Sequence, residues 1–208
     1  MSAIYTFAHD HRDSKYYPLD GSYSIFEILH SGFGVFKQNN GLKRTYLKVK
    51  FNHHLPINSR WHFSTGNTGL IHLQDNQPFF IENGLGYSRD YLRGYEYYVI
   101  PCEHYLYTKN NLKFTLVPKT VQKLKLIPLE KFNKMHYALY FNIGFDWGYA
   151  KALQHHSSLN NNLANTSLYS ISTGLDLVTY YDNVISFAYT LNKQGDSGFF
   201  IHFHAPIQ

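Results

Sequence analysis

The chain has 208 residues, of which 16% are charged and 18% aromatic, with a formal net charge of +5. Charged residues make up about 25% of typical globular proteins, so this composition is unusual for a soluble domain, and the abundance of aromatic side chains excludes intrinsic disorder. No apolar stretch approaches the ~18 residues of a membrane helix, which excludes a helical membrane protein. The absence of any dense Lys/Arg run argues against a nucleic-acid partner.

Alternation of apolar and polar residues predicts about nine β-strands, because successive side chains of a strand point to opposite faces of a sheet. The first, second and fourth of these candidates show the weakest alternation. In chain order the candidates are residues 2–10, 22–34, 46–52, 60–70, 105–116, 135–150, 168–180, 184–192 and 199–208.

The strongest alternation runs through residues 135–150, where Phe141, Ile143 and Phe145 belong to an entirely apolar or aromatic set of positions. The intervening positions are small or polar and include Asp146. A run this long exceeds the about five or six residues of an ordinary strand and is typical of transmembrane β-barrels. We predict a lipid-facing surface made of Phe141, Ile143, Phe145, Ile201 and Phe203.

The predicted connections alternate between short turns and longer segments, as in barrels with short turns on one rim and long loops on the other. The Lys-rich segment 118–133 is the exception, because it is long but falls on the short-turn side. The strands of a soluble β-sandwich or a lipocalin-like barrel also show alternating apolar and polar residues, so periodicity alone leaves these folds as an alternative. The short turns are expected at 17–21, 55–58 and 181–183, and the longer segments at 37–42, 71–102, 150–166 and 192–198.

Several short motifs occur in an informative order. They are Asp10-His11-Arg12-Asp13 leading to Pro18-Leu19-Asp20-Gly21, Arg93-Gly94-Tyr95-Glu96, Phe145-Asp146-Trp147-Gly148, Gly174-Leu175-Asp176-Leu177 and the closing Gly198-Phe199-Phe200-Ile201-His202-Phe203. The order and spacing of these motifs, across essentially all 208 residues, resemble those of the BamA-like outer-membrane assembly factors (the bacterial surface antigen family). The residue patterns are similar to those of members from Bacteroidetes-like bacteria.

This resemblance implies an all-β fold: an antiparallel transmembrane β-barrel in the bacterial outer membrane, which inserts or exports client proteins. Family members carry POTRA domains before a sixteen-stranded barrel, so we expect residues 1–208 to be the carboxyl-terminal portion of that barrel, without a POTRA domain. We further expect the chain to be a fragment of a longer protein. The implied partners are outer-membrane lipid, the amino-terminal barrel half with its POTRA domains, and client outer-membrane or secreted proteins.

The resemblance also implies a loop that folds back into the barrel lumen. Arg93 would be the tip of this loop and Asp146 its partner on the barrel wall, with Gly94, Tyr95 and Glu96 completing the loop motif. The tyrosines could instead form an aromatic girdle at the membrane interface. Where the family often has a second acidic residue on the preceding strand, this chain is expected to have Lys113, so the pairing would rest on Asp146 alone or on Asp146 with Glu96.

We expect neither an enzyme nor a bound cofactor. No nucleophile–base motif or phosphate-binding loop occurs, and the single cysteine permits no multi-cysteine metal site. His9 with His11 and His202 with His204 have a spacing that places both rings on one strand face, but no acidic or cysteine partner accompanies them, so no metal is predicted. Alternative functions are a barrel that anchors an upstream phosphoesterase or patatin-type enzyme domain, and a plain pore.

Overall fold

The structure is a computed structural model that describes residues 2–32, 43–74, 84–86, 90–123, 134–152, 162–179 and 183–204. These residues form one antiparallel sheet of nine strands whose spatial order is their order in the chain. The prediction of an all-β fold with nine strands is confirmed. The strands are β1 (Ser2–Asp10), β2 (Gly21–Ser31), β3 (Arg44–Pro56), β4 (Trp61–His72), β5 (His104–Lys123), β6 (Lys134–Lys151), β7 (Ser167–Val178), β8 (Val184–Asn192) and β9 (Ser197–His204).

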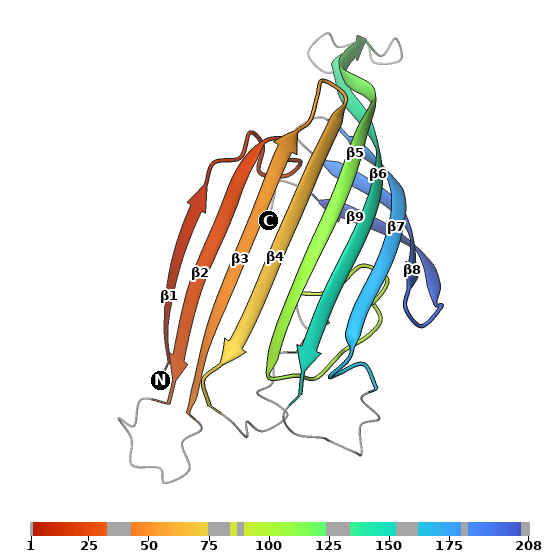
Figure 1. The fold of residues 1–208 in the computed structure, drawn as a ribbon. Helices are drawn as coiled ribbons and strands as arrows, with labels where there is room; N and C mark the ends of the chain where they lie inside the picture. Colours follow the sequence, from red (N-terminus) through yellow and green to blue (C-terminus); the bar gives the residue numbers. More distant parts are fainter. Residues whose placement is uncertain are drawn as a thin grey trace.

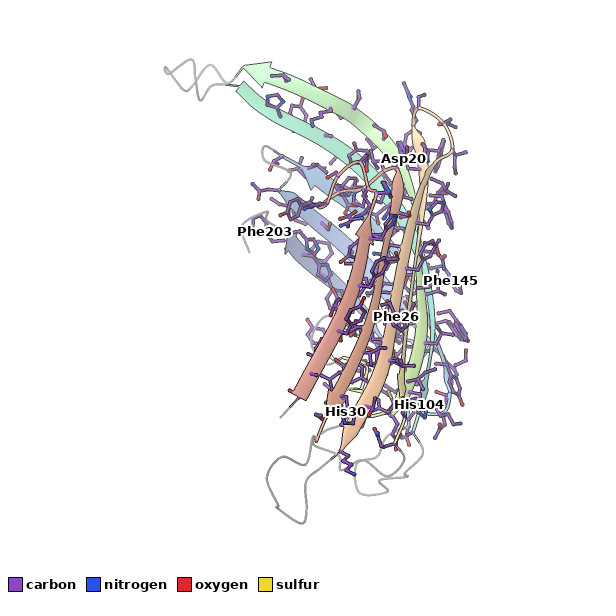
Figure 2. The ribbon with its side chains drawn as sticks, turned by 90° about the vertical axis from the view of Figure 1, so that its left-hand side faces the viewer. Asp20, Phe26, His30, His104, Phe145 and Phe203 are labelled. Carbon is purple, nitrogen blue, oxygen red and sulfur yellow. The ribbon has the colours of Figure 1, made fainter. Side chains whose placement is uncertain are left out.

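The sheet is a tilted and curved wall, in which β8 and β9 curve round behind β5–β7 in the view of Figure 1. It is not closed, because β1 and β9 each pair with a single neighbour, β2 and β8 respectively. The connections β1–β2, β3–β4, β5–β6 and β7–β8 lie at one rim, called here the upper rim, and the other four at the lower rim. Asp20 marks the upper rim in Figure 2, and His30 and His104 mark the lower one. Within the described residues, no helix is long and apolar enough to span a membrane.

The two faces of the sheet differ as the alternation predicts. On the convex outer face Ile143 and Phe145 are 45% and 49% exposed, and Ile201 and Phe203 are 62% and 61% exposed, while Phe141 is half-buried. Figure 2 shows Phe145 on the convex side. An apolar surface of this extent on a folded protein marks an interaction site, because burying apolar surface away from water lowers the free energy. Further outward apolar side chains on β3, β5, β7, β8 and β9 include Val49, Phe51, Leu106, Ile171, Leu175, Phe187, Tyr189, Leu191 and Phe199.

The concave inner face carries many buried polar side chains, and its lower half also carries buried apolar and aromatic ones. Asn142, Asp146, Ser170, Ser172, Thr190 and Asn192 are all buried there. Burial of so many polar side chains is possible because a segment between β4 and β5 folds back over this face and packs onto it. The hydrophobic core therefore lies between that segment and the lower half of the inner face rather than between two sheets.

The sequence pattern places two connections incorrectly. Residues 118–123 were expected in the Lys-rich connection, but they continue β5, which pairs with β6 as far as Lys123 opposite Lys134. The register shifts between Thr115 and Val117 and between Val117 and Thr120. These irregularities accommodate Pro118, because proline has no backbone N–H to donate to the neighbouring strand. The remainder of that connection, and most of the predicted long segments at 37–42 and 150–166, lie outside the described residues.

The first upper-rim connection is also larger than the short turn expected at 17–21. It covers residues 11–20 and closes through hydrogen bonds from His11 N to Ser22 O (2.8 Å) and from Asp13 N to Asp20 O (3.2 Å). Asp13 Oδ1 also accepts from the backbone N–H groups of Leu19 (3.0 Å) and Asp20 (3.3 Å). These contacts give the connection a defined shape that folds inward over the sheet.

Candidate functional site: a loop docked on the inner face

The segment between β4 and β5 supplies five of the fifteen apolar side chains that are buried among the described residues. Leu85, Leu92, Tyr95, Ile100 and Cys102 are each at most 2% exposed. Backbone hydrogen bonds between Ile100 N and Leu85 O (2.8 Å) and between Gly86 N and Asp90 O (2.7 Å) hold the segment together. Figure 1 shows the segment behind the lower halves of β5–β7. Its apolar side chains pack against residues of the sheet that include Tyr46, Leu70, Tyr105, Tyr107, Ala150 and Leu168.

Arg93 lies at the point where this loop meets β6, and it binds Asp146 with both its side chain and its backbone. Arg93 Nε donates to Asp146 Oδ2 (2.9 Å), Nη2 pairs with Oδ1, and the backbone N–H of Arg93 donates to Oδ2 (3.1 Å). A bidentate guanidinium–carboxylate pair is directional as well as strong. The structure therefore brings together the two residues that the resemblance pairs.

The guanidinium of Arg93 also reaches β5. Nη1 donates to Asn111 Oδ1 (3.2 Å) and Nη2 donates to the carbonyl oxygen of Asn110 (3.0 Å). The side chain of Asp146 is only 1% exposed and that of Arg93 is 17% exposed. A buried pair of this kind depends on such additional hydrogen bonds, because removing two charges from water is costly.

Two glycines allow this approach. Gly94 has a φ of +78°, which is a left-handed conformation that other residues adopt only with strain, and it turns the chain directly after Arg93. Gly144 lies under the guanidinium, and a Cβ at this position would be 2.3 Å from Arg93 Nη1 and 2.4 Å from Ser172 Oγ. The space occupied by the arginine therefore exists only because residue 144 has no side chain.

The tyrosines of this loop differ in burial and in their contacts. Tyr95 is 2% exposed, and its hydroxyl donates to the carbonyl oxygen of Tyr169 (3.2 Å). Tyr98 also holds the loop, because its hydroxyl donates to Asp196 in the β8–β9 connection. Tyr97 is 85% exposed, and its ring centroid lies 5.4 Å from that of Phe200 on β9. The carbonyl oxygen of Gly94 adds a further contact by accepting from Asn192 Nδ2 (2.9 Å).

Asp90 anchors the other side of the loop and was not found from the sequence. It pairs with Lys48 of β3 and accepts from the hydroxyls of Tyr105 (2.9 Å) and Tyr107 (3.2 Å) of β5. Burial by itself would raise the pKa of Asp90, but the Lys48 ammonium and the tyrosine hydroxyls outweigh it and hold this pKa below its usual range. The loop is thus bound to β3 and β5 through Asp90, to β6 through Arg93 and to β7 and β8 through Tyr95 and Gly94.

Glu96 does not join the ion pair, contrary to one of the two alternatives. Both of its carboxylate oxygens are buried without a hydrogen-bond partner among the described residues. Burial raises the pKa of this carboxyl group, because a low-dielectric environment disfavours the charged form. The carboxylate of Asp146 therefore serves Arg93 without help from Glu96.

The residue opposite Asp146 on β5 is Lys109, not Lys113. Lys113 pairs with Asn142, further toward the upper rim, and its ammonium donates to the carbonyl oxygen of Pro18 (3.1 Å). Lys113, expected at the position of the family's second acidic residue, is therefore four residues along β5 from the residue that faces Asp146. The partners that β5 offers Arg93 are the side chain of Asn111 and the backbone of Asn110.

Among the described residues no group of three or more His, Cys, Asp or Glu side chains is placed to hold a metal ion. The rings of His9 and His11 touch each other with centroids 4.5 Å apart, and His202 stacks between Tyr91 (6.4 Å) and Phe200 (6.2 Å).

Comparison with known proteins adds no relative: no family model matches the chain, and neither a curated protein nor a solved structure is significantly similar to it. The site is therefore interpreted from its own geometry.

Proposed function

We propose that the chain is part of the wall of a β-barrel in a bacterial outer membrane, and that this barrel belongs to a factor that inserts or exports client proteins. The observation that carries the proposal is the loop folded over the inner face and bound there by Arg93 and Asp146. A passive connection between two hairpins needs only a few residues. A long segment that turns inward and is held by strands β3, β5, β6, β7 and β8 controls the inside of the structure.

The membrane location is supported by the distribution of side chains over the two faces. Apolar and aromatic side chains are exposed on the outer face, and polar ones are buried on the inner face. Outer-membrane barrels show this arrangement, with lipid on the apolar side and a polar interior. In a soluble sheet the apolar face would be covered by a second layer, and none of the described residues covers it.

The open edges support the partners named by the resemblance. An open sheet in lipid would leave the free N–H and C=O groups of β1 and β9 without hydrogen bonds, and each such group costs several kcal/mol in hydrocarbon. The proposal therefore includes further strands that complete the barrel, contributed by an amino-terminal barrel half that follows POTRA domains. Lipid would cover the outer face, and client proteins would enter from the periplasmic side.

The test is a client-folding assay in vesicles of outer-membrane lipid. The complete barrel, including the strands that close it, is reconstituted, an unfolded outer-membrane protein is added, and the folded fraction is followed by its resistance to heat in gel electrophoresis. We expect faster client folding than in empty vesicles, and we expect Arg93→Ala and Asp146→Ala to abolish the acceleration. Tyr97→Ala changes an exposed residue of the same loop and serves as the matched control. Client folding at the rate of empty vesicles would contradict the proposal.

A further inference from the structure

Two segments fold over the inner face from opposite rims and leave a chamber between them. The loop that carries Arg93 enters from the lower rim. Residues 11–20 enter from the upper rim, where Tyr17 donates to Asp176 of β7 (2.9 Å) and Pro18 O accepts from Lys113 of β5 (3.1 Å). The chamber between them has a volume of about 350 Å³. It is large enough for a small solute with its hydration water.

The charges that line this chamber are mainly positive. Lys50, Lys109, Lys113 and Arg93 contribute four cationic groups, whereas Asp176 is the one acidic residue among the described residues of the lining. The carboxylate of Asp146 is already bound by Arg93. The lining also contains hydroxyl, amide and imidazole groups that can donate hydrogen bonds, among them Asn52, Ser64, Asn142, Ser186 and His54.

Aromatic rings hold two of the ammonium groups in place. Lys109 Nζ lies 4.2 Å from the ring centroid of Tyr91 and 5.5 Å from that of Tyr107, and Lys113 Nζ lies 4.0 Å from that of Tyr17. A cation over an aromatic face is positioned without being neutralised. Neither lysine belongs to one of the three ion pairs formed among the described residues.

Positioned cations in a partly dry chamber repel one another, and an anion would relieve that repulsion. Lysine ammonium groups bind phosphate as point charges, and the surrounding hydroxyl, amide and imidazole groups can donate further hydrogen bonds. We propose that this chamber is a binding site for a small oxyanion, a phosphate group carried by a soluble molecule. The chamber opens on the inner face, away from the apolar outer face, so a soluble phosphate has access where a lipid headgroup does not.

The probe is inorganic phosphate, titrated into the purified chain in detergent at constant ionic strength and compared with chloride. We expect phosphate to bind saturably in calorimetry and to raise the melting temperature, because a ligand that binds only the folded state stabilises it. Chloride should do neither. An equal effect of the two anions would overturn the proposal, and this comparison uses the unaltered chain, so it stands even if a variant fails to fold.

Substitutions then locate the site. Lys109→Met and Lys113→Met keep the aliphatic stem and remove the charge, and each should weaken phosphate binding tenfold or more. Lys119→Met is the matched control, since Lys119 lies on the same strand, is exposed and does not line the chamber. Unchanged affinity in the first two variants, or an equal loss in the control, would show that phosphate binds elsewhere. Vesicles that carry phosphate headgroups, added as a competitor, should not displace inorganic phosphate; displacement would contradict a soluble ligand.

Discussion

Removing either partner of the Arg93–Asp146 pair should release the loop, and the two losses should not add. In Arg93→Ala the carboxylate of Asp146, whose side chain is 1% exposed, is left buried without its cation. In Asp146→Ala the guanidinium keeps only Asn111 and the carbonyl of Asn110. Breaking a buried pair by removing one partner costs about 3–5 kcal/mol.

The double variant removes both charges, so no charge is left stranded. It should therefore lose about 3–5 kcal/mol, as each single variant does, rather than their sum, which gives a coupling as large as one single loss, about 3–5 kcal/mol. Arg93→Lys should not restore the native value, because an ammonium cannot form the bidentate contact.

The quantity to measure is the free energy of opening the loop, from hydrogen exchange of the backbone amides of residues 90–102. Exchange in β7 and β8 reports on whether the sheet itself is intact. Strictly additive losses in the double variant would mean that Arg93 and Asp146 do not stabilise the loop through each other, and the reasoning would be refuted.

Three further predictions concern the space beneath the loop, its pH dependence and the outer face. Gly144→Ala should lower the opening free energy as much as Arg93→Ala, because the new Cβ would occupy the position of the guanidinium. The raised pKa of Glu96 means that the docked loop prefers the protonated carboxyl group. The contribution of Glu96 to docking is therefore full below the ordinary pKa of 4.5 and is lost as the pH rises through the raised pKa. The protease sensitivity of the loop should increase over that pH range, and Glu96→Gln should remove the increase. Ile143→Arg should destabilise the protein in lipid by roughly 2–4 kcal/mol if its position is near the bilayer midplane, measured by denaturant unfolding in vesicles.

Each of these has a control within the same sheet. At Gly69 the nearest atom to an added Cβ is 3.5 Å away, so Gly69→Ala should leave the loop docked, and equal effects at the two glycines would contradict the steric explanation. A pH dependence that persists in Glu96→Gln would assign it to another group. For Ile143, the comparison is Lys119→Arg at an exposed position that is already charged, and a loss no larger than this control would contradict a lipid-facing role.

The number of strands, and the face of the sheet that each side chain occupies, could be predicted from the period-two alternation, because successive side chains of a strand point to opposite faces. The pattern placed Asp146 on the inner face and Ile143 on the outer one, and β8 was predicted with its observed bounds, Val184–Asn192. The proximity of Arg93 to Asp146 came from the resemblance and not from periodicity, since alternation gives the face of a residue but not its distant neighbours.

Contacts that depend on register or on the path of a loop could not be predicted. Lys109 rather than Lys113 lies opposite Asp146 because two register shifts and a long connection set the alignment of β5 with β6. The bond from Tyr17 to Asp176 joins residues 159 positions apart, and neither belongs to a pattern that would suggest the other. Asp90 carried no local signal, because its role comes from Lys48 and two tyrosines on other strands.

The central claim, that the outer face lies in a membrane, is tested most directly by spin labels on β6. Single cysteines are introduced at Phe141, Ile143 and Phe145 and at Asn142, with Cys102 replaced by Ser, and each is labelled with a nitroxide in protein reconstituted in lipid vesicles. We expect labels at the three outward positions to collide with oxygen, which concentrates in lipid, and not with a water-soluble nickel complex. The label at Asn142 should show the opposite preference or little access to either. Ready collision of the nickel complex with all three outward labels would place that face in water and contradict the account.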